Sequence, residues 1–357
     1  CDGGNLSIQF VDEVDRDGMG NESAPNYNYS WLTRLFDLAN TLDKYSSDPK
    51  YNLYKYPKFA KMFTAYAPLV IAGSQTAQIA DTGSTANTVY VDGLDTIIDG
   101  FNHLKDTSLG KTLAKYIYRR NGYTVDGLRY GIFSNDPESI QKEITDRLDE
   151  NNDAVSEMMP AYGFSILRSG VKRGEGASSV NNLQDFWIYF GRTSASHSHF
   201  DALNLGIEAF GLNMAPEIGY PELTGANPNR LQWVRQTISH NTVVVDEKGQ
   251  NAEMIHGTPM HFDDSGDIKV MDIDAPKAYR SASIYRRTVV TVKATPDVSY
   301  GVDFFRVKGG KVHTYSFHSQ SNSISETSGL NLGPQVDASG NYVGTYAGTD
   351  SVFGEDP

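Results

Sequence analysis

The stretch Ser196-His197-Ser198-His199-Phe200-Asp201 decides the fold of this chain, together with Ser239-His240-Asn241-Thr242 further along. Three of the eight histidines fall in these two short stretches. The segments beside them are rich in the apolar, aromatic and β-branched residues that favour strands. On a strand, His197 and His199 would point to the same face, because side chains alternate with a period of two. Two imidazoles on one face, with a third from another strand, predict a metal site, a catalytic site, or both.

Strand-like segments recur throughout the second half of the chain, with Gly, Asn and Asp at the turns between them. Their regular spacing predicts a large antiparallel β-sandwich over residues 158–357. The expected strands are 162–170, 185–191, 202–210, 242–246, 267–273, 285–293, 299–307 and 312–318.

The first half of the chain has apolar residues at helical rather than strand spacing. This spacing therefore predicts a helical domain over residues 1–157. The whole chain is expected to be a multidomain α+β protein. The expected helices are 30–40, 59–66, 94–103, 113–119 and 140–150.

Composition restricts the partners that this chain can have. Its formal net charge of −13 argues against a protein that coats nucleic acid. There is no run of about 18 apolar residues, so no membrane-spanning helix is expected. The single cysteine, Cys1, excludes an internal disulfide and a cysteine-based metal site. A local basic cluster could still bind an acidic substrate, and the candidates are Lys172-Arg173, Arg192, Arg230, Arg235 and Arg286-Arg287.

Four stretches, in this order along the chain, resemble the heparinase II/III-like polysaccharide lyases. They are Asp17–Tyr27, Ser196–Asp201, Glu217–Tyr220 and Trp233–Asp246. The resemblance extends over roughly residues 10 to 320 and implies an incomplete α/α-toroid followed by an antiparallel β-sandwich. Helices that the family has before its Asp-Gly element are missing here, so we expect a fragment that is also truncated at its C-terminus.

Such lyases cleave uronic-acid polysaccharides by β-elimination. The enzyme must neutralise the sugar carboxylate, remove the proton at C5 and protonate the departing oxygen O4. The resemblance implies that Asn21 neutralises the carboxylate, that His197 handles the C5 proton, and that Tyr66 protonates the leaving oxygen.

Each of these three assignments has a structural alternative. The amide of Asn21 can donate to a carboxylate without carrying charge, but Asn21 could instead cap the following helix. The imidazole of His197, with an ordinary pKa of ~6.5, suits a general base, although it could be a buried, hydrogen-bonded histidine. Tyr66 lies at helical spacing with apolar neighbours and could belong to the core, and Tyr54 and Tyr56 compete for its role.

The resemblance also implies a zinc site formed by His199, Glu217 and His240. Histidine and carboxylate ligands suit Zn²⁺, and the ion is expected to be structural, tying together the strands that hold His197. The family has Asp at the position of Glu217, so Asp201 or Glu222 could supply the carboxylate instead. An ordinary polar cluster without metal is the alternative.

Tyr220 and Arg235 are the expected substrate contacts. Arginine can bind a carboxylate or sulfate through two hydrogen bonds, and tyrosine can stack on a sugar; Arg235 could otherwise belong to a structural ion pair. The short stretch Asp81-Thr82-Gly83-Ser84 resembles a loop of the family.

The sequence thus predicts a lyase that acts on an acidic polysaccharide. The alternative is a non-catalytic carbohydrate-binding protein or inactive fragment that keeps the fold and the metal. A zinc hydrolase is disfavoured because the chain has no His-Glu-x-x-His motif. The expected localisation is periplasmic or secreted, with lipid anchoring through Cys1 left open. The identity of the glycan, the endo or exo mode and the oligomeric state are also open.

Overall fold

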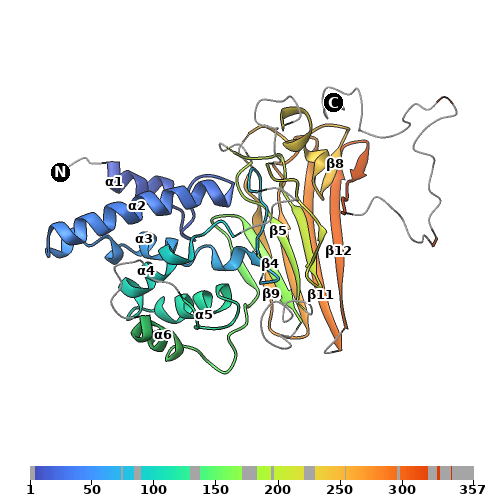
Figure 1. Ribbon diagram of the computed structural model, residues 1–357. Helices are drawn as coiled ribbons and strands as arrows, with labels where there is room; N and C mark the ends of the chain where they lie inside the picture. The colour runs from blue at the N-terminus through green and yellow to red at the C-terminus, as the bar shows by residue number, and fades with distance from the viewer. Residues whose placement is uncertain are drawn as a thin grey trace.

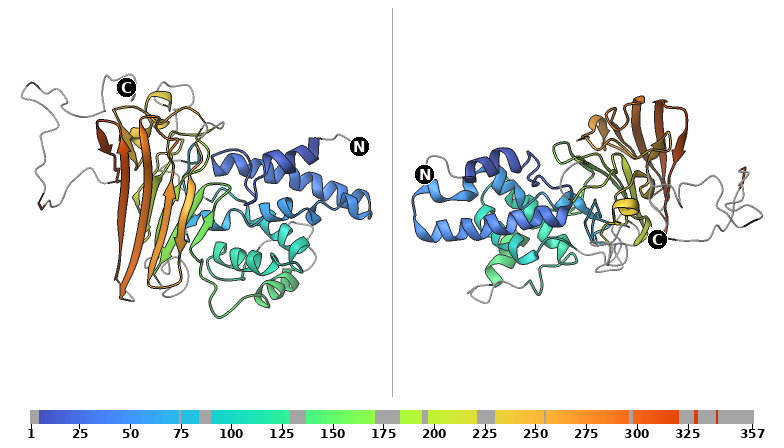
Figure 2. Two further views of the ribbon diagram at one scale, coloured as in Figure 1. Left: turned by 180° about the vertical axis from the view of Figure 1, so that it is seen from behind. Right: turned by 90° about the horizontal axis from the view of Figure 1, so that it is seen from above.

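The structure of this protein is a computed structural model. It describes residues 5–73, 75–83, 90–128, 137–170, 183–193, 197–220, 230–253, 255–295, 298–320, 328–329 and 339. Glu222, Lys172-Arg173 and most of the chain after residue 320 lie outside these residues, so the expectations placed on them are not addressed. The helices gather on one side and the sheets on the other (Figures 1 and 2).

The first half of the chain is mainly helical, and each of the five helices expected there overlaps an observed one. The helices are α1 (Asn5–Ile8), α2 (Pro25–Tyr45), α3 (Pro57–Met62), α4 (Leu94–Leu104), α5 (Gly110–Arg120) and α6 (Pro137–Thr145). The short π- and 3₁₀-helices are η1 (Gln9–Glu13), η2 (Pro49–Tyr51), η3 (Leu53–Lys55) and η4 (Ala67–Leu69).

Helix α2 is longer than the sequence pattern indicated. Pro25 lies in its first turn, where the missing N–H costs nothing because that group would have no helical acceptor. Leu32, Leu35 and Ala39 form one buried face, at the spacing that brings side chains to the same side of a helix. Leu42 continues this face, partly buried against the same core, and the helix ends where Ser46 adopts extended backbone angles.

The second half of the chain is dominated by antiparallel sheets. One sheet has the strand order β3-β4-β5-β6-β7, a second has β12-β11-β10-β9, and the pairs β13-β8 and β1-β2 complete the set. The strands are β1 (Val70–Ile71), β2 (Gln75–Thr76), β3 (Glu157–Met159), β4 (Phe164–Ser169), β5 (Gln184–Tyr189), β6 (Asn204–Ala209), β7 (Leu212–Ala215), β8 (Val243–Val245), β9 (Thr258–Asp263), β10 (Ile268–Asp274), β11 (Ala282–Thr295), β12 (Val298–Gly309) and β13 (His313–Tyr315). Helices followed by antiparallel sheets agree with the expected α+β class.

The five-stranded sheet is covered on both faces. Along β5, Trp187 and Tyr189 belong to a core shared with the helices, whereas Ile188 belongs to a core shared with β10 and β11. This alternation follows from the two-residue period of a strand. Burial on both faces agrees with the apolar run Phe186–Tyr189 in β5, whereas the first two residues of the strand, Gln184 and Asp185, are polar.

A buried arginine connects the two large sheets close to the second histidine stretch. Arg287 on β11 is fully buried and forms an ion pair with Asp303 on β12, at 2.9 Å. It also donates to the backbone carbonyls of Leu203 and Asn241, at 2.6 and 2.5 Å. Because Asn241 follows His240, these bonds fix the backbone that presents that histidine.

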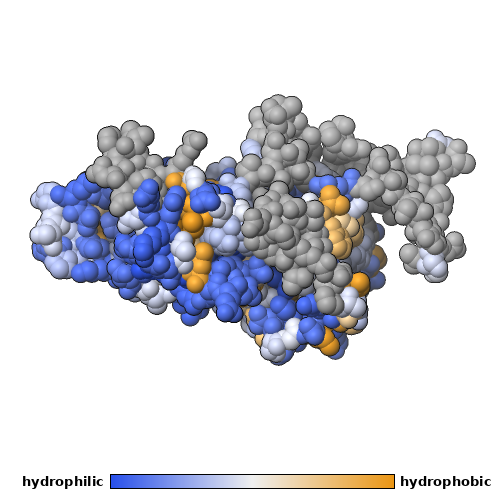
Figure 3. Space-filling model, turned by 60° about the horizontal axis from the view of Figure 1, so that its bottom comes forward, coloured by the Kyte–Doolittle hydropathy of each residue, from blue (hydrophilic) through white to orange (hydrophobic). Residues whose placement is uncertain are grey.

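The surface seen from below is mostly hydrophilic over the helical half, with a narrow apolar strip and further apolar patches toward the sheets (Figure 3). Within the described residues, no helix is long and apolar enough to cross a membrane.

Candidate functional site

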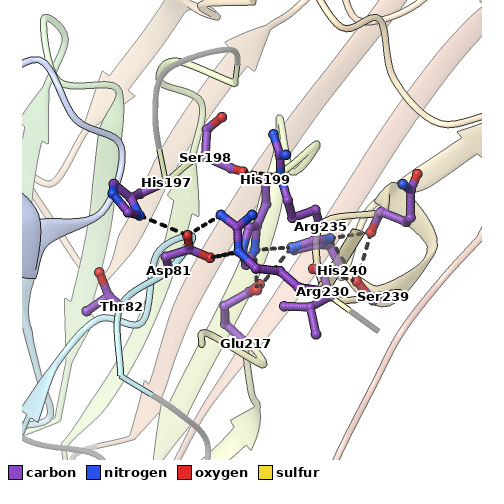
Figure 4. A network of polar contacts seen from close by, with 12 residues as sticks. Asp81, Thr82, His197, Ser198, His199, Glu217, Arg230, Arg235, Ser239 and His240 are labelled. Atoms are coloured by element: carbon purple, nitrogen blue, oxygen red, sulfur yellow. Dashed lines mark hydrogen bonds and ion pairs between the residues drawn. The ribbon is translucent and has the colours of Figure 1, made fainter. Parts of the chain in front are cut away.

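The two histidine stretches meet a third loop that lies more than a hundred residues earlier in the chain. This loop contains Asp81, whose carboxylate lies between His197 and Arg230 (Figure 4). Nδ1 of His197 is 3.2 Å from Oδ2 of Asp81, and Nε2 of His199 is 3.0 Å from Oδ1. Arg230 donates to both carboxylate oxygens. One buried carboxylate therefore connects both histidines of the first stretch to a guanidinium group.

The expectation that His197 and His199 share a strand is wrong. Strand β5 ends at Tyr189, and both histidines lie in the loop that precedes β6. His197 has a φ of 59°, in the left-handed region that β-strands do not use. Its carbonyl accepts a hydrogen bond from the N–H of Asp81 at 3.3 Å. The two rings thus converge on Asp81 through a loop rather than through strand periodicity.

His199, Glu217 and His240 are brought together as the sequence analysis expected. Nδ1 of His199 is 3.1 Å from Nε2 of His240, and Oε1 of Glu217 is 3.4 Å from the first nitrogen and 3.0 Å from the second. Tetrahedral zinc with bonds of about 2.0–2.2 Å places its ligand atoms about 3.3–3.6 Å apart. The three donor atoms therefore fit a zinc ion with a small outward adjustment.

The outer hydrogen bonds of this triad also suit a metal. His199 can donate from Nε2 to Asp81, His240 from Nδ1 to the Gln236 carbonyl at 2.7 Å, and Asn204 donates to Oε2 of Glu217 at 3.0 Å. In the neutral tautomers that these bonds favour, the ring N–H groups point outward and the inner nitrogens are the ones that would bind a metal. Such an outer shell is typical of metal-binding histidines.

Asp201 is a fourth group beside the triad. Its ligand atoms lie within 4.8 Å of those of His199 and His240, and all three residues are buried. Oδ1 of Asp201 is buried and accepts no hydrogen bond from the residues that the structure describes. Burial raises the pKa of its carboxyl group to about 7. Asp201 could therefore serve as a further ligand beside Glu217.

The charges within the cluster stabilise one another. Burial would raise the pKa of Glu217, but His240 and His199 outweigh it and lower that pKa to about 2. Burial would lower the pKa of His199, but the hydrogen bonds with Asp81 and Glu217 raise it to about 9. For Asp81, hydrogen bonds from His199 and Arg230 outweigh burial and hold the pKa well below its usual value. The carboxylates of Glu217 and Asp81 are thus held ionised by the positive charges around them, whereas burial outweighs those charges at Asp201.

His197 differs from the rest of the cluster because it reaches solvent. Its side chain is 32% exposed, whereas the side chains of His199 and His240 are fully buried. Its ring stacks on Tyr27, with centroids 3.5 Å apart and planes 11° apart. The guanidinium of Arg230 lies 5.6 Å from the ring of Tyr220. This exposed edge of the cluster thus presents an imidazole, two phenols and a cation.

The chain matches a known protein family. A family model described as heparinase II/III-like, C-terminal, matches residues 153–348, which is more than half of the chain. The chain belongs to the heparinase II/III-like family. No curated protein matches it.

Solved structures of heparinases have a similar fold. A heparinase III with methylated lysines is 17% identical, with a TM-score of 0.62; the match covers 90% of this chain and 43% of that one. The heparan sulfate lyase HepC from Pedobacter heparinus is 15% identical, with a TM-score of 0.57 and coverage of 85% and 40%. This family member therefore spans about two fifths of the length of these structures.

Asn21 does not cap the helix that follows it. The N-cap of α2 is Ala24, and no side-chain hydrogen bond caps the helix there. The amide of Asn21 donates instead to the carboxylate of Glu13, while its backbone carbonyl accepts from Arg192 at 3.3 Å. The capping alternative is therefore wrong, and Asn21 lies beside a carboxylate.

Tyr66 lies in the helical core, and its described ring contact is with Tyr29 rather than His197. It is 1% exposed, and the two tyrosine rings meet edge-on. Burial raises its pKa well above the ordinary value. The two competing tyrosines do not join His197 either: Tyr54 stacks on His103 and Tyr56 on Phe10. The aromatic partner of His197 is Tyr27.

Arg235 lies beside the cluster, where its side chain contacts the backbone of the histidine loop. Its Nε donates to the carbonyl of Ser198 at 2.9 Å, so it supports the loop that carries both histidines. Burial, and then the neighbouring Arg230, lower the pKa of its guanidinium. Within the described residues Arg235 forms no ion pair with a carboxylate, and its side-chain hydrogen bond goes to the Ser198 carbonyl.

Sequence reasoning missed the roles of Asp81, Arg230 and Tyr27. Asp81 was noticed only as part of a short stretch, and nothing local indicates that it would contact residues more than a hundred positions away. Arg230 appeared only in a list of basic residues, although it lies just before the Trp-containing stretch. Tyr27 is the last residue of the Asp17–Tyr27 stretch, so its position beside His197 could have been proposed from the motif.

Proposed function

We propose that this protein is a polysaccharide lyase that cleaves a uronic-acid glycan by β-elimination. Its family and structural neighbours suggest a polysaccharide lyase, and an acidic polysaccharide is the matching substrate class. The finer fold belongs to the same proposal: an incomplete α/α-toroid over 1–157 and a β-sandwich over 158–357. A periplasmic or secreted location would give access to such a polymer.

The observation that carries the proposal is the contact between His197 and Asp81. A carboxylate at 3.2 Å favours the tautomer with the proton on Nδ1, and this tautomer leaves Nε2 as the basic nitrogen. Because the side chain is partly exposed, that nitrogen can meet a polymer that arrives from solvent. This is the arrangement that a general base requires: correct tautomer, fixed ring and access.

The phenol of Tyr27 supports a proton donor on the same side. Burial raises its pKa, followed by the charge of Asp81, so the hydroxyl keeps its proton at neutral pH. Tyr27 therefore suits protonation of the departing O4 better than the buried Tyr66. Arg230 and Arg235 supply positive charge for the sugar carboxylate, together with the amide of Asn21 once it is released from Glu13.

Zinc held by His199, Glu217 and His240 would be structural in this proposal. The ion would supply positive charge between three inward-facing acceptors and keep the loop of His197 in place. His199 would link the zinc ion to His197, because its outer nitrogen and His197 bond to the same carboxylate, that of Asp81.

One observation favours the alternative of a non-catalytic carbohydrate-binding protein. The amide of Asn21 is already engaged by Glu13, whose charge would repel a uronate. The two functions are separated by incubating the zinc-loaded protein with heparan sulfate, chondroitin sulfate, hyaluronan and alginate. Only elimination creates an unsaturated uronate, which absorbs in the ultraviolet; binding without that signal would support the alternative.

A further inference from the structure

The loop that carries Asp81 also contacts the helix that carries Tyr27. Thr82, the next residue along the chain, is 2% exposed and donates from Oγ1 to Oδ1 of Asn26 at 3.0 Å. Asn26 lies in the first turn of α2, directly before Tyr27. Thr82 and Asp81 are drawn together in Figure 4. One loop therefore bonds to His197 through its carboxylate and to the start of α2 through its hydroxyl.

This loop is held in a fixed conformation by the sheet half of the protein. Ala80 has a φ of 53°, a left-handed conformation that costs energy for a residue other than glycine. The N–H of Asp81 donates to the carbonyl of His197 at 3.3 Å, and the carbonyl of Gly83 accepts from the N–H of Tyr220 at 2.5 Å. The loop is therefore a rigid support for the groups that it contacts.

The start of α2 depends on contacts of this kind. Its N-cap, Ala24, has no side-chain capping bond, so the usual anchor of a first turn is missing. Ser23 attaches the chain before the helix, because its hydroxyl donates to the carbonyl of Arg192 at 2.5 Å. The bond from Thr82 is made inside the first turn, one residue before Tyr27. It therefore acts on the turn that presents the phenol.

The position of this phenol matters because Tyr27 lies directly on the ring of His197. The two ring centroids are 3.5 Å apart and the planes are 11° apart. In the proposed elimination the imidazole takes the proton from C5, the C4–O4 bond breaks as a C4–C5 double bond forms, and the phenol gives its proton to O4. Both groups act on one sugar, and a misplacement of about 1 Å can cost about 10²-fold in rate.

We propose that Thr82 is a positioning residue: through Asn26 it holds Tyr27 against His197, while Asp81 beside it orients the imidazole. One loop thus aligns the two groups that transfer protons, one from each half of the protein. The catalytic consequence rests on the proposed function, but the alignment itself can be measured without a substrate.

The alignment is tested by the NMR shifts of the His197 ring protons in histidine-labelled protein, assigned by their loss in His197→Ala. The stacked ring of Tyr27 shifts these protons upfield, and Tyr27→Leu measures the full shift. Thr82→Val should lose most of this shift, whereas Thr82→Ser keeps the hydroxyl and should retain it. Thr64→Val is the matched control, because the Thr64 hydroxyl is also buried and donates at 3.0 Å to a carbonyl, that of Lys61.

The catalytic consequence is tested on whichever uronic-acid polysaccharide the parent cleaves. Thr82→Val should lower kcat about tenfold and leave KM within about twofold, because it misaligns the proton donor without removing a substrate contact. Thr82→Ser should restore kcat, and Thr64→Val should behave as the parent does. A purely structural hydroxyl would instead lower stability in both valine variants and leave kcat unchanged in the folded fraction.

Unchanged His197 ring shifts in Thr82→Val would overturn the proposal, whatever the activity. Loss of the shift in Thr64→Val as well would also overturn it, because the effect would then be general destabilisation. If Thr82→Val does not fold, Asn26→Ala removes the acceptor of the same bond and should lose the same shift. A parent that cleaves no polymer would refute the proposed function, and the ring shifts would still decide whether Thr82 aligns the two rings.

Discussion

Replacing Asp81 by asparagine probes the whole cluster, because this one carboxylate receives His197, His199 and Arg230. The amide that replaces it keeps a single acceptor oxygen and turns a donor toward one of the three groups. At least one N–H group then faces another donor, and Arg230 loses its counter-charge. The substitution changes neither the size nor the shape of the side chain substantially, so packing effects are small.

The structure sets the expected size of the effect. Removing one partner of a buried ion pair costs about 3–5 kcal/mol. Arg230 retains 18% side-chain exposure, so the lower end, about 3 kcal/mol, applies to the free energy of unfolding. His199 also loses the acceptor of its outer N–H, and such losses reduce metal affinity about 10–100-fold. Loss of the fixed tautomer of His197 should lower kcat/KM by about 10²-fold or more.

The assays are denaturant unfolding, zinc content and the rate of unsaturated-uronate formation, each compared with Asp37→Asn at an exposed position of α2. Asp81→Asn should be impaired in all three and the control in none. If Asp81→Asn matched the control in stability and activity, the assignment of Asp81 as the residue that positions both histidines would be refuted.

Three further substitutions test other parts of the molecule. His240→Ala removes one of the three inner donors, so zinc content and the thermal unfolding temperature should fall together; a variant that keeps stoichiometric zinc would contradict the triad. Gly219→Ala should destabilise the protein by about 1–3 kcal/mol, because Gly219 has a φ of 69° and an added Cβ would lie 2.5 Å from the carbonyl oxygen of Gly83; an unchanged unfolding curve would argue against this close loop contact. Glu208 is buried, which raises its pKa from 4.5 to about 7, so the folded state binds its proton more tightly than the unfolded state. The protonated carboxyl group therefore adds to the free energy of unfolding below pH 4.5, and this addition, at most about 3 kcal/mol, is lost as the pH rises through 7. Glu208→Gln should flatten the dependence of the free energy of unfolding on pH over this range. An unchanged pH dependence would assign the effect to another group.

Much of the fold was predictable because the core imposes its period on the sequence. The apolar spacing predicted a helix over 94–103, and α4 spans Leu94–Leu104. A strand was predicted over 285–293, and β11 spans Ala282–Thr295, where Tyr285, Arg287, Val289 and Thr291 are buried in alternation. Strand β9 (Thr258–Asp263) was missed; it has no fully buried residue and contains a proline, which argues against a strand when it is met in a sequence.

The candidate site was predictable only where chemistry and motif order carried the information. The grouping of His199, Glu217 and His240 came from the resemblance to the lyase family, and the structure brings the three side chains together. The loop geometry of His197 was not predicted, because a loop with a left-handed residue leaves no periodic signal in the sequence. Asp81 and Arg230 were recognised only in the structure, since their contacts join segments that are far apart in the sequence.

The central claim is that His197 acts as the base of an elimination reaction. The most direct measurement is ultraviolet absorbance of unsaturated uronate while the parent protein and His197→Ala are incubated with each uronic-acid polysaccharide. The account predicts a rising signal with at least one polymer for the parent, and none for His197→Ala at the same unfolding temperature and zinc content. A folded, zinc-loaded parent that gives no signal with any polymer, or a His197→Ala variant as active as the parent, would contradict it.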